Sequence, residues 1–260
     1  MSLQRHVSST RLVPKLFRRY SNVADGFEAD FCKTHCPTNA FQKSLLMVGS
    51  AAISLFNPFR ADMIACLGET TGDQALKYMK SCMEQSGEGS QILREQPRIN
   101  TRTVHLEHLK HLPEDTLGYM YYRFLEKNQV TPDSRDAVQF VDDMELAYVI
   151  QRYREAHDLI HTVLQMPTNM LGEVTVKWVE AIQFKLPMCI GGAIFGPLRL
   201  KTKHRQLYLN HHLPWAVKTG LEAKFLLNIY FEKRWEQKVD DFYKEINITP
   251  LKLKQQTKSL

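Results

Sequence analysis

The segment from Asp142 to Gln165 constrains the fold of this chain most, because its apolar residues recur every three or four positions. At about 100° per residue, this spacing predicts one helix with a stripe that covers less than about a third of its circumference. The stripe consists of Leu146, Ile150, Tyr153, His157, His161 and Leu164. A long helix with one apolar face is buried against other helices, so both histidines are expected to point into the core.

A proline-containing turn follows this helix. Pro167 disfavours helical conformation in the residue before it, so the helix is expected to end near Met166. The next periodic segment, Asn169–Leu186, then predicts a second helix that runs antiparallel to the first. Glu173 lies in about the first turn of this second helix, where its carboxylate can return opposite His161.

The rest of the chain is also helical in pattern, and alternating strand patterns are nearly absent. A turn is expected at Ser86–Gly89, and the remaining predicted helices are Phe41–Leu55, Arg60–Leu67, Asp73–Met83, Val104–Leu112, Thr116–Asn128 and Glu222–Ile246. The first of these is expected to be buried. With 260 residues, 43% of them hydrophobic, the chain can bury one full core. We predict an all-α protein, a single compact helical bundle with a metal site between two central antiparallel helices.

Residues 1–20 carry five basic residues and no acid, and they lack the continuous apolar core of a secretory signal. These features are typical of a mitochondrial transit peptide, with a disordered basic arm as the alternative. We predict a transit peptide over 1–20, an N-terminal extension over 21–37, an all-helical domain over 38–250 and a C-terminal tail over 251–260. Without those five charges the formal net charge falls from +6 to +1. That is too little for a nucleic-acid-binding surface, so no nucleic acid partner is expected.

The central helix pair carries a candidate metal site. His157 and His161 are four residues apart, so their rings lie one turn apart on one face and can bind one cation. Asp158 lies at the edge of that face, about 60° round the helix from His161. The Glu173 carboxylate is expected opposite His161. These four residues make a mixed nitrogen and oxygen site for a divalent cation, and Lys177 could hold an anionic substrate group. The alternative is a buried polar cluster without a metal.

The pattern differs from the HExxH motif of zinc hydrolases, in which a glutamate acts as general base. Asp158 stands in that place here, and this shorter acid makes such a role doubtful.

The apolar stretch Leu186–Leu200 is too short to span a bilayer and is interrupted by glycine and proline. It is either a core segment or an apolar surface that rests among lipid headgroups. Its glycines either let an apolar ligand lie close to the backbone or permit close helix packing.

The spacing His157-Asp158-x2-His161-x11-Glu173 resembles the signature of the fourth coenzyme Q (ubiquinone) biosynthesis protein family, which is mitochondrial. The flanks DDMELAYVIQRYREAHDLIHTVLQMPTNMLGE and VKWVEAIQFKLPMCIGGAIFGPLRL are similar to the same family. So are LFNPFRADMIACLGETTG, LPEDTLGYMYYRFL and NIYFEKRWEQ. The similarity extends from about Thr38 to Gln237.

This resemblance implies a carbon–carbon lyase, a polyprenyl hydroxybenzoate decarboxylase that removes the C1 carboxyl group of 4-hydroxy-3-methoxy-5-polyprenylbenzoate. It implies a divalent metal, usually taken as Zn²⁺, at His157, Asp158, His161 and Glu173. Coupling of the decarboxylation to hydroxylation would require oxygen or a redox-active metal, because zinc has no redox chemistry. The alternative is a non-catalytic scaffold that binds lipid intermediates and organises the coenzyme Q biosynthetic complex.

The resemblance also implies a peripheral protein on the matrix side of the mitochondrial inner membrane. The expected partners are other coenzyme Q biosynthesis proteins in a multiprotein complex, polyprenylated benzoate intermediates and the inner-membrane lipid surface. A homo-oligomer is a further option.

Overall fold

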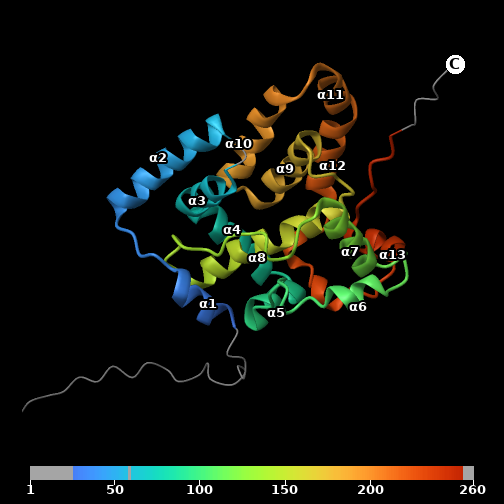
Figure 1. The fold of residues 1–260 in the computed structure, drawn as a ribbon, viewed down its shortest axis with the longest axis horizontal. Coiled ribbons are helices and arrows are strands. Elements are labelled where there is room, and N and C mark those ends of the chain that lie inside the picture. Colours follow the sequence, from blue (N-terminus) through green and yellow to red (C-terminus); the bar gives the residue numbers. More distant parts are fainter. Residues whose placement is uncertain (1–25, 58–59, 254–260) are drawn as a thin grey trace, which may run out of the picture.

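The structure, a computed structural model, describes residues 26–57 and 60–253. Within these residues the regular elements are helices that pack into one compact body, with a single isolated β-bridge between Thr116 and Lys238 and no strand (Figure 1). The prediction of an all-α, single compact fold is confirmed. In the same part of the chain, no helix combines the length and apolarity needed to cross a bilayer.

The α-helices are α1 (Phe27–Thr34), α2 (Ala40–Phe56), α3 (Ala61–Thr71), α4 (Asp73–Glu84), α5 (Gly87–Glu95), α6 (Leu106–Lys110), α7 (Leu117–Asn128), α8 (Met144–Val163), α9 (Met170–Phe184), α10 (Pro187–Phe195), α11 (Thr202–Leu207), α12 (Leu213–Glu222) and α13 (Val239–Ile246). Short 3₁₀ segments are η1 (Gly196–Arg199), η3 (Leu226–Asn228) and η4 (Phe231–Lys233), and η2 (Tyr208–His212) is a π-helical turn.

Helix α8 crosses the middle of the molecule and is buried from Leu146 to Val163 (Figure 1). The Asp143 carboxylate accepts a hydrogen bond from the Leu146 backbone N–H at 3.0 Å and so caps its N-terminus. Helices α1, α4, α5, α7 and α9 contact α8 from different sides. Side chains that α8 directs toward α9 are therefore held in a rigid, largely dry environment.

The turn between α8 and α9 ends one helix and starts the next through backbone and side-chain hydrogen bonds. The Met166 N–H donates to the His161 carbonyl at 2.9 Å while Gln165 occupies the left-handed region with φ 53°. This arrangement is the Schellman motif that commonly closes helices. Asn169 then caps α9 by accepting from the Gly172 N–H at 3.0 Å. The predicted helix–turn–helix is confirmed.

Gly172 is required at that turn. A Cβ atom there would lie 1.9 Å from the Pro167 carbonyl oxygen, so no larger residue fits without moving the backbone.

Helix α2 has nearly the predicted bounds, but the expectation that it is buried is wrong. Phe41 is 77% exposed and Phe56 is 90% exposed, and Ser50 is the one residue of the helix that is fully buried. The helix packs mainly on α3. Its apolar composition predicted burial, yet composition alone cannot distinguish a helix buried in the core from an apolar helix on the surface.

The prediction of a single helix over Glu222–Ile246 is also wrong. Helix α12 ends at Glu222, and η3 and η4 precede α13. Gln183 replaces the helical hydrogen bonds here, because its amide donates to the Ala223 carbonyl and accepts from the Leu226 N–H. The intervening side chains are fully buried on more than one side, which a single helical face cannot achieve: Leu226, Leu227, Ile229 and Phe231.

The Ser86–Gly89 segment, predicted as a turn, is the start of α5. The Ser86 hydroxyl accepts from the Gly89 N–H at 3.3 Å and acts as its N-cap. Helix α1 falls inside the predicted N-terminal extension, and its Phe27 and Phe31 lie in the main hydrophobic core. The predicted transit peptide, residues 1–20, lies outside the described residues.

Candidate metal centre

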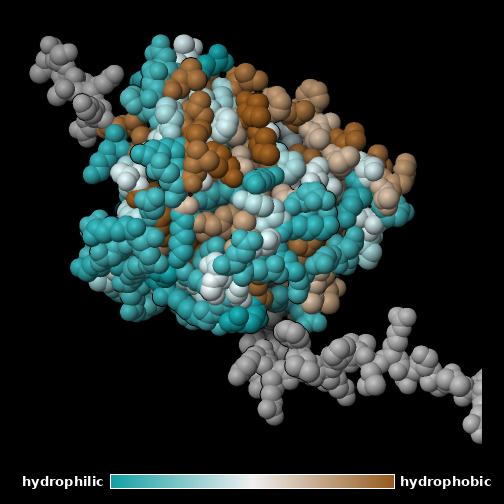
Figure 2. Space-filling model, turned by 180° about the vertical axis from the view of Figure 1, so that it is seen from behind, coloured by the Kyte–Doolittle hydropathy of each residue, from teal (hydrophilic) through white to brown (hydrophobic). Residues whose placement is uncertain are grey.

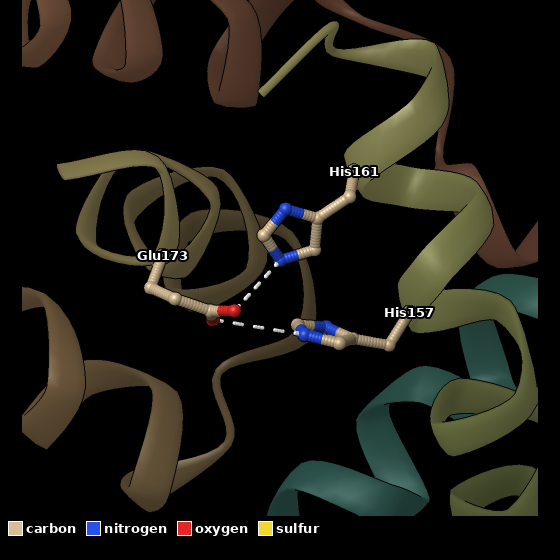
Figure 3. A group of neighbouring side chains, drawn as sticks. All are labelled: His157, His161 and Glu173. Atoms are coloured by element: carbon tan, nitrogen blue, oxygen red, sulfur yellow. Dashed lines mark ion pairs between the residues drawn. The ribbon is translucent and has the colours of Figure 1, made fainter. Parts of the chain in front are cut away.

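Two histidines of α8 and one glutamate of α9 converge in the core (Figure 3). The Nε2 atom of His157 lies 3.8 Å from Glu173 Oε2, and the Nε2 atom of His161 lies 3.4 Å from Glu173 Oε1. The three potential ligand atoms lie within 4.8 Å of one another. Both histidines are buried, while the Glu173 side chain keeps 34% of its surface exposed, so the centre opens to the outside on the Glu173 side.

The other nitrogen of each imidazole is fixed by an oxygen acceptor. The Nδ1–H of His157 donates to Glu180 Oε1 at 2.5 Å, and that of His161 donates to the Met166 carbonyl at 3.1 Å. Because Nδ1 carries the proton in both rings, the Nε2 lone pairs are directed at Glu173. The Met166 carbonyl belongs to the Schellman motif, so the residues that end α8 also orient His161.

His161 has an unsatisfied atom. Its Nε2 is buried without a hydrogen-bond partner in the described part of the chain, and Glu173 Oε1 lies 3.4 Å away. Buried polar atoms are nearly always paired, so an orphan here indicates a missing ligand.

Asp158, predicted as a fourth ligand, is not grouped with these three. Its Oδ1 accepts a hydrogen bond from the Arg135 guanidinium at 2.7 Å. Consecutive helical residues point about 100° apart, so Asp158 faces the segment before α8 while His157 faces α9. The structure therefore brings together three of the four predicted ligands, and direct coordination by Asp158 stays a prediction.

Lys177, predicted to hold an anionic substrate group, lies beside the centre with its ammonium already paired. It donates to Glu180 Oε2 at 2.6 Å and to the Tyr153 hydroxyl at 3.1 Å. Burial alone would lower the pKa of Lys177, but the charge of Glu180 outweighs it and holds that pKa above its usual range. Its contact with a substrate stays a prediction.

Glu180 is the residue that sequence reasoning missed. It is fully buried and accepts from His157, Lys177 and Tyr153. Burial would raise the pKa of Glu180, but Lys177 and then His157 outweigh burial and hold it well below its usual value. A signal was present, because Glu180 lies two turns after Glu173 on the same stripe of α9.

The charges around the centre favour a divalent cation. Three carboxylates (Glu173, Glu180 and Asp158) meet two cations (Lys177 and Arg135), which leaves one negative charge. Burial would raise the pKa of Glu173, but His161, His157 and Lys177 outweigh it and lower that pKa to about 2. Burial lowers the pKa of His157, which therefore presents a neutral, ligating imidazole.

The donor set itself is two imidazole nitrogens and a carboxylate, which suits zinc and similar cations. Cys189 lies nearby, but burial raises the pKa of its thiol to about 12, and it does not share the group.

Helix α10 and η1 pack on α9 near Val174 and Lys177, and two glycines lie at this contact. A Cβ on Gly196 would lie 2.6 Å from Val174 Cγ2, and one on Gly192 would lie 3.2 Å from Lys177 Cγ. These glycines permit close packing of α10 and η1 on the helix that carries Glu173. The outer side of the same segment is exposed at Ile194, as expected for an apolar surface.

The chain is thus an all-helical protein in which two buried histidines and one partly exposed glutamate form a candidate metal centre. Residues 32–252 match the family model described as "Coenzyme Q (ubiquinone) biosynthesis protein Coq4". The chain therefore belongs to the Coq4 family of ubiquinone biosynthesis proteins.

Two relatives agree with this assignment, and a solved structure shares the fold. The chain is 57% identical over 240 residues to the mitochondrial ubiquinone biosynthesis protein COQ4 homolog of Bombyx mori, which covers 91% of this chain and 93% of the relative. It is 56% identical over 229 residues to the homolog of Aedes aegypti, which covers 88% and 84%. A crystal structure of a candidate ubiquinone biosynthesis protein from Nostoc punctiforme has the same fold, with a TM-score of 0.63 at 17% identity over 80% of this chain and 97% of that one.

Proposed function

We propose that this protein catalyses the metal-dependent removal of the C1 carboxyl group from 4-hydroxy-3-methoxy-5-polyprenylbenzoate. Membership of the Coq4 family establishes its place in ubiquinone biosynthesis. The observation that carries the proposed activity is the unpaired, buried Nε2 atom of His161, aimed with that of His157 at Glu173.

The three residues fit a divalent cation, for which Zn²⁺ is the first choice. Catalytic zinc sites typically have three protein ligands and one open position, whereas structural sites are closed by four. A centre of His157, His161 and Glu173, open on the glutamate side, matches the catalytic type. When bound, the cation would supply a Lewis acid that polarises and orients a substrate oxygen.

The substrate chemistry needs a proton and an electron-rich ring. A proton adds at C1, the C1–carboxyl bond breaks, and its electron pair restores the aromatic ring as CO2 leaves. The 4-oxygen assists because it donates electron density into the ring at C1. One proton is consumed and one CO2 is released.

The chain's own groups would position the reactants. Glu180 holds the His157 ring through its 2.5 Å hydrogen bond, and this keeps Nε2 directed outward. Lys177 lies one turn beyond Glu173, where its positive charge would attract the substrate carboxylate. Glu180 is buried and Lys177 is held in an ion pair with it, so both groups are preorganised before substrate arrives.

The proposed setting is the matrix face of the mitochondrial inner membrane, as a peripheral member of the coenzyme Q biosynthetic complex. The mitochondrial names of the homologues support the organelle. A polyprenylated substrate partitions into lipid, so an enzyme that acts on it must work at a membrane surface.

The test is release of labelled CO2. The full chain, loaded with one divalent metal at a time, is incubated with carboxyl-labelled substrate, with and without oxygen. Metal-dependent release that is lost in His157→Ala and Glu173→Ala, both folded by circular dichroism, is the expected result. Oxygen dependence, with a hydroxyl rather than a hydrogen at C1 of the product, would assign coupled hydroxylation. Metal-loaded protein that binds the lipid without releasing CO2 would refute catalysis and favour the scaffold.

A further inference from the structure

Helix α2 presents an apolar surface that nothing covers among the described residues. Only a narrow stripe of α2 contacts α3, and the helix is exposed on most of its other sides. Its exposed large hydrophobic side chains are Phe41, Leu45, Met47, Val48, Ile53, Leu55 and Phe56. Monomeric soluble proteins rarely leave so contiguous an apolar surface in water, so it indicates a partner or a membrane.

A second exposed apolar patch adjoins the end of α2. It comprises Ile194, Phe195 and Leu198 of α10 and η1. The Arg199 guanidinium donates to the Leu55 carbonyl and so ties η1 to the end of α2. Figure 2 shows hydrophobic residues gathered along the upper edge of the molecule, the edge on which α2, α10 and α11 lie in Figure 1.

Within the sequence segments that form these patches, all the charged residues are basic. No acidic residue occurs between Lys185 and Glu222, or between Phe31 and Ala61. Lys201 and Lys203 are exposed and form no ion pair in the part of the chain that the structure describes. Arg205 donates only to backbone carbonyls there. On α2 itself, Lys43 is paired with Asp142. Elsewhere on the surface several lysines are likewise paired with carboxylates: Lys77, Lys80, Lys224, Lys233, Lys238 and Lys244.

We infer that α2, α10, η1 and the basic start of α11 form one surface that docks on an anionic phospholipid bilayer. Large apolar side chains flanked by unpaired cations match a headgroup layer above a hydrocarbon boundary. In a symmetric pair, a second copy would bring the same cations to the interface, whereas anionic headgroups would neutralise them.

This orientation places the candidate metal centre next to the membrane. The inner side of α10 and η1 contacts Val174 and Lys177 of the helix that carries Glu173, while the outer side is the docking surface. The inference thus extends the proposed function, because it supplies the surface on which a lipid substrate would be met.

The test measures vesicle binding by the full chain. The vesicles are phosphatidylcholine alone, or phosphatidylcholine with phosphatidylglycerol, and binding is followed by co-sedimentation. The apolar variant is Phe41→Gln, Leu45→Gln, Val48→Gln, and the charge variant is Lys201→Gln, Lys203→Gln. Matched controls are Leu221→Gln, an equally exposed leucine of α12, and Lys244→Gln on α13. All chains share the basic residues 1–20, so their contribution cancels in the comparison.

We expect binding to the anionic vesicles and a loss of about tenfold or more in each surface variant, with both controls unchanged. Hydrogen–deuterium exchange should show vesicle-induced protection of α2 and of residues 186–205, and none in α6. Equal binding by wild type and variants, or protection elsewhere, would overturn the inference. A dimer in solution that the apolar variant dissociates, without protection by vesicles, would assign the face to a second copy.

Failure of the two proposals can be told apart. His157→Ala should bind vesicles like wild type, and the surface variants should retain their metal. Vesicle binding without CO2 release would leave this surface standing while refuting the decarboxylase.

Discussion

At the residue scale, Glu180 determines how the candidate metal centre is held, although it is not itself grouped with the ligands. It accepts from His157 and balances the buried charge of Lys177. Groups that orient a metal-binding imidazole are typically worth about 10–100-fold in metal affinity. We therefore predict that Glu180→Gln weakens zinc binding by about that factor, measured by competitive chelator titration.

The same substitution also removes the ion-pair partner of the partly buried Lys177, which costs at most about 3–5 kcal/mol. The double variant Glu180→Gln, Lys177→Met controls for this cost. It should recover thermal stability without recovering metal affinity. Recovery of both would mean that Glu180 acts only by balancing charge.

Substitutions of Glu173 and of Asp158 are predicted to differ in how much they weaken metal binding. Glu173→Gln should reduce metal affinity by more than the ~100-fold that supporting groups supply, because it removes a ligand. Asp158→Asn should have a smaller effect, because that side chain faces Arg135. Isothermal titration of each variant with zinc measures the difference. Equal losses in both variants would show that Asp158 is a ligand after all.

At this scale the sequence predicted those parts of the candidate site that depend on helical geometry alone. The i, i+4 spacing and the turn predicted that His157, His161 and Glu173 would meet. It could not show that Asp158 turns to Arg135, because that arginine lies in a segment without periodicity. Glu180 was readable from its stripe on α9, but only once the site was known to extend two turns along that helix.

At the scale of elements, the contact of η1 with α9 depends on Gly196. We predict that Gly196→Ala destabilises the fold by about 1–3 kcal/mol, because its Cβ would meet Val174 at 2.6 Å. Gly191→Ala in the preceding helix α10 is the matched control, since a Cβ there meets nothing within 4 Å. That change should be neutral or stabilising by up to about 1 kcal/mol.

Urea unfolding of both variants measures these effects. Adding Val174→Ala to Gly196→Ala should recover part of the loss if the clash is its cause. Equal stability of the two alanine variants would contradict close packing at Gly196.

The positions of α8 and α9 followed from periodicity, but the exposure of α2 did not. In the structure, Asp143 and Asn169 cap the N-termini of α8 and α9. Helix α2 shows the opposite case, because an apolar segment has the same pattern whether it meets the core or a membrane. The segment after Glu222 departs from a helix because Gln183, far away in sequence, supplies its hydrogen bonds.

At the scale of the whole molecule, Glu88 joins distant parts of the chain. It accepts from the Tyr230 N–H at 2.8 Å, from Lys224 at 3.0 Å and from Arg234 at 2.9 Å. Burial would raise the pKa of Glu88, but these donors outweigh it and lower that pKa below 4.5. We predict that Glu88→Gln lowers the free energy of unfolding at neutral pH by about 1–3 kcal/mol.

The pH dependence follows from the direction of that shift. A carboxyl group with a depressed pKa in the folded state stabilises the fold above its unfolded pKa, and this stability is lost as pH falls through the folded value. The difference between wild type and Glu88→Gln should therefore be largest above the ordinary pKa of a glutamate and shrink as pH falls below it. Chemical unfolding at several pH values measures it, and a pH-independent difference would mean that the charge of Glu88 is not what matters.

The central claim is a divalent cation held by two imidazoles and one carboxylate beside an open position. X-ray absorption of the full chain loaded with one equivalent of zinc tests it most directly. We predict nitrogen and oxygen neighbours at about 2.0–2.2 Å with imidazole scattering and no sulfur. His161→Ala should reduce the imidazole signal, and Asp158→Asn should leave the spectrum unchanged. Failure to bind zinc, a sulfur neighbour, or a spectrum insensitive to His161→Ala would contradict the account.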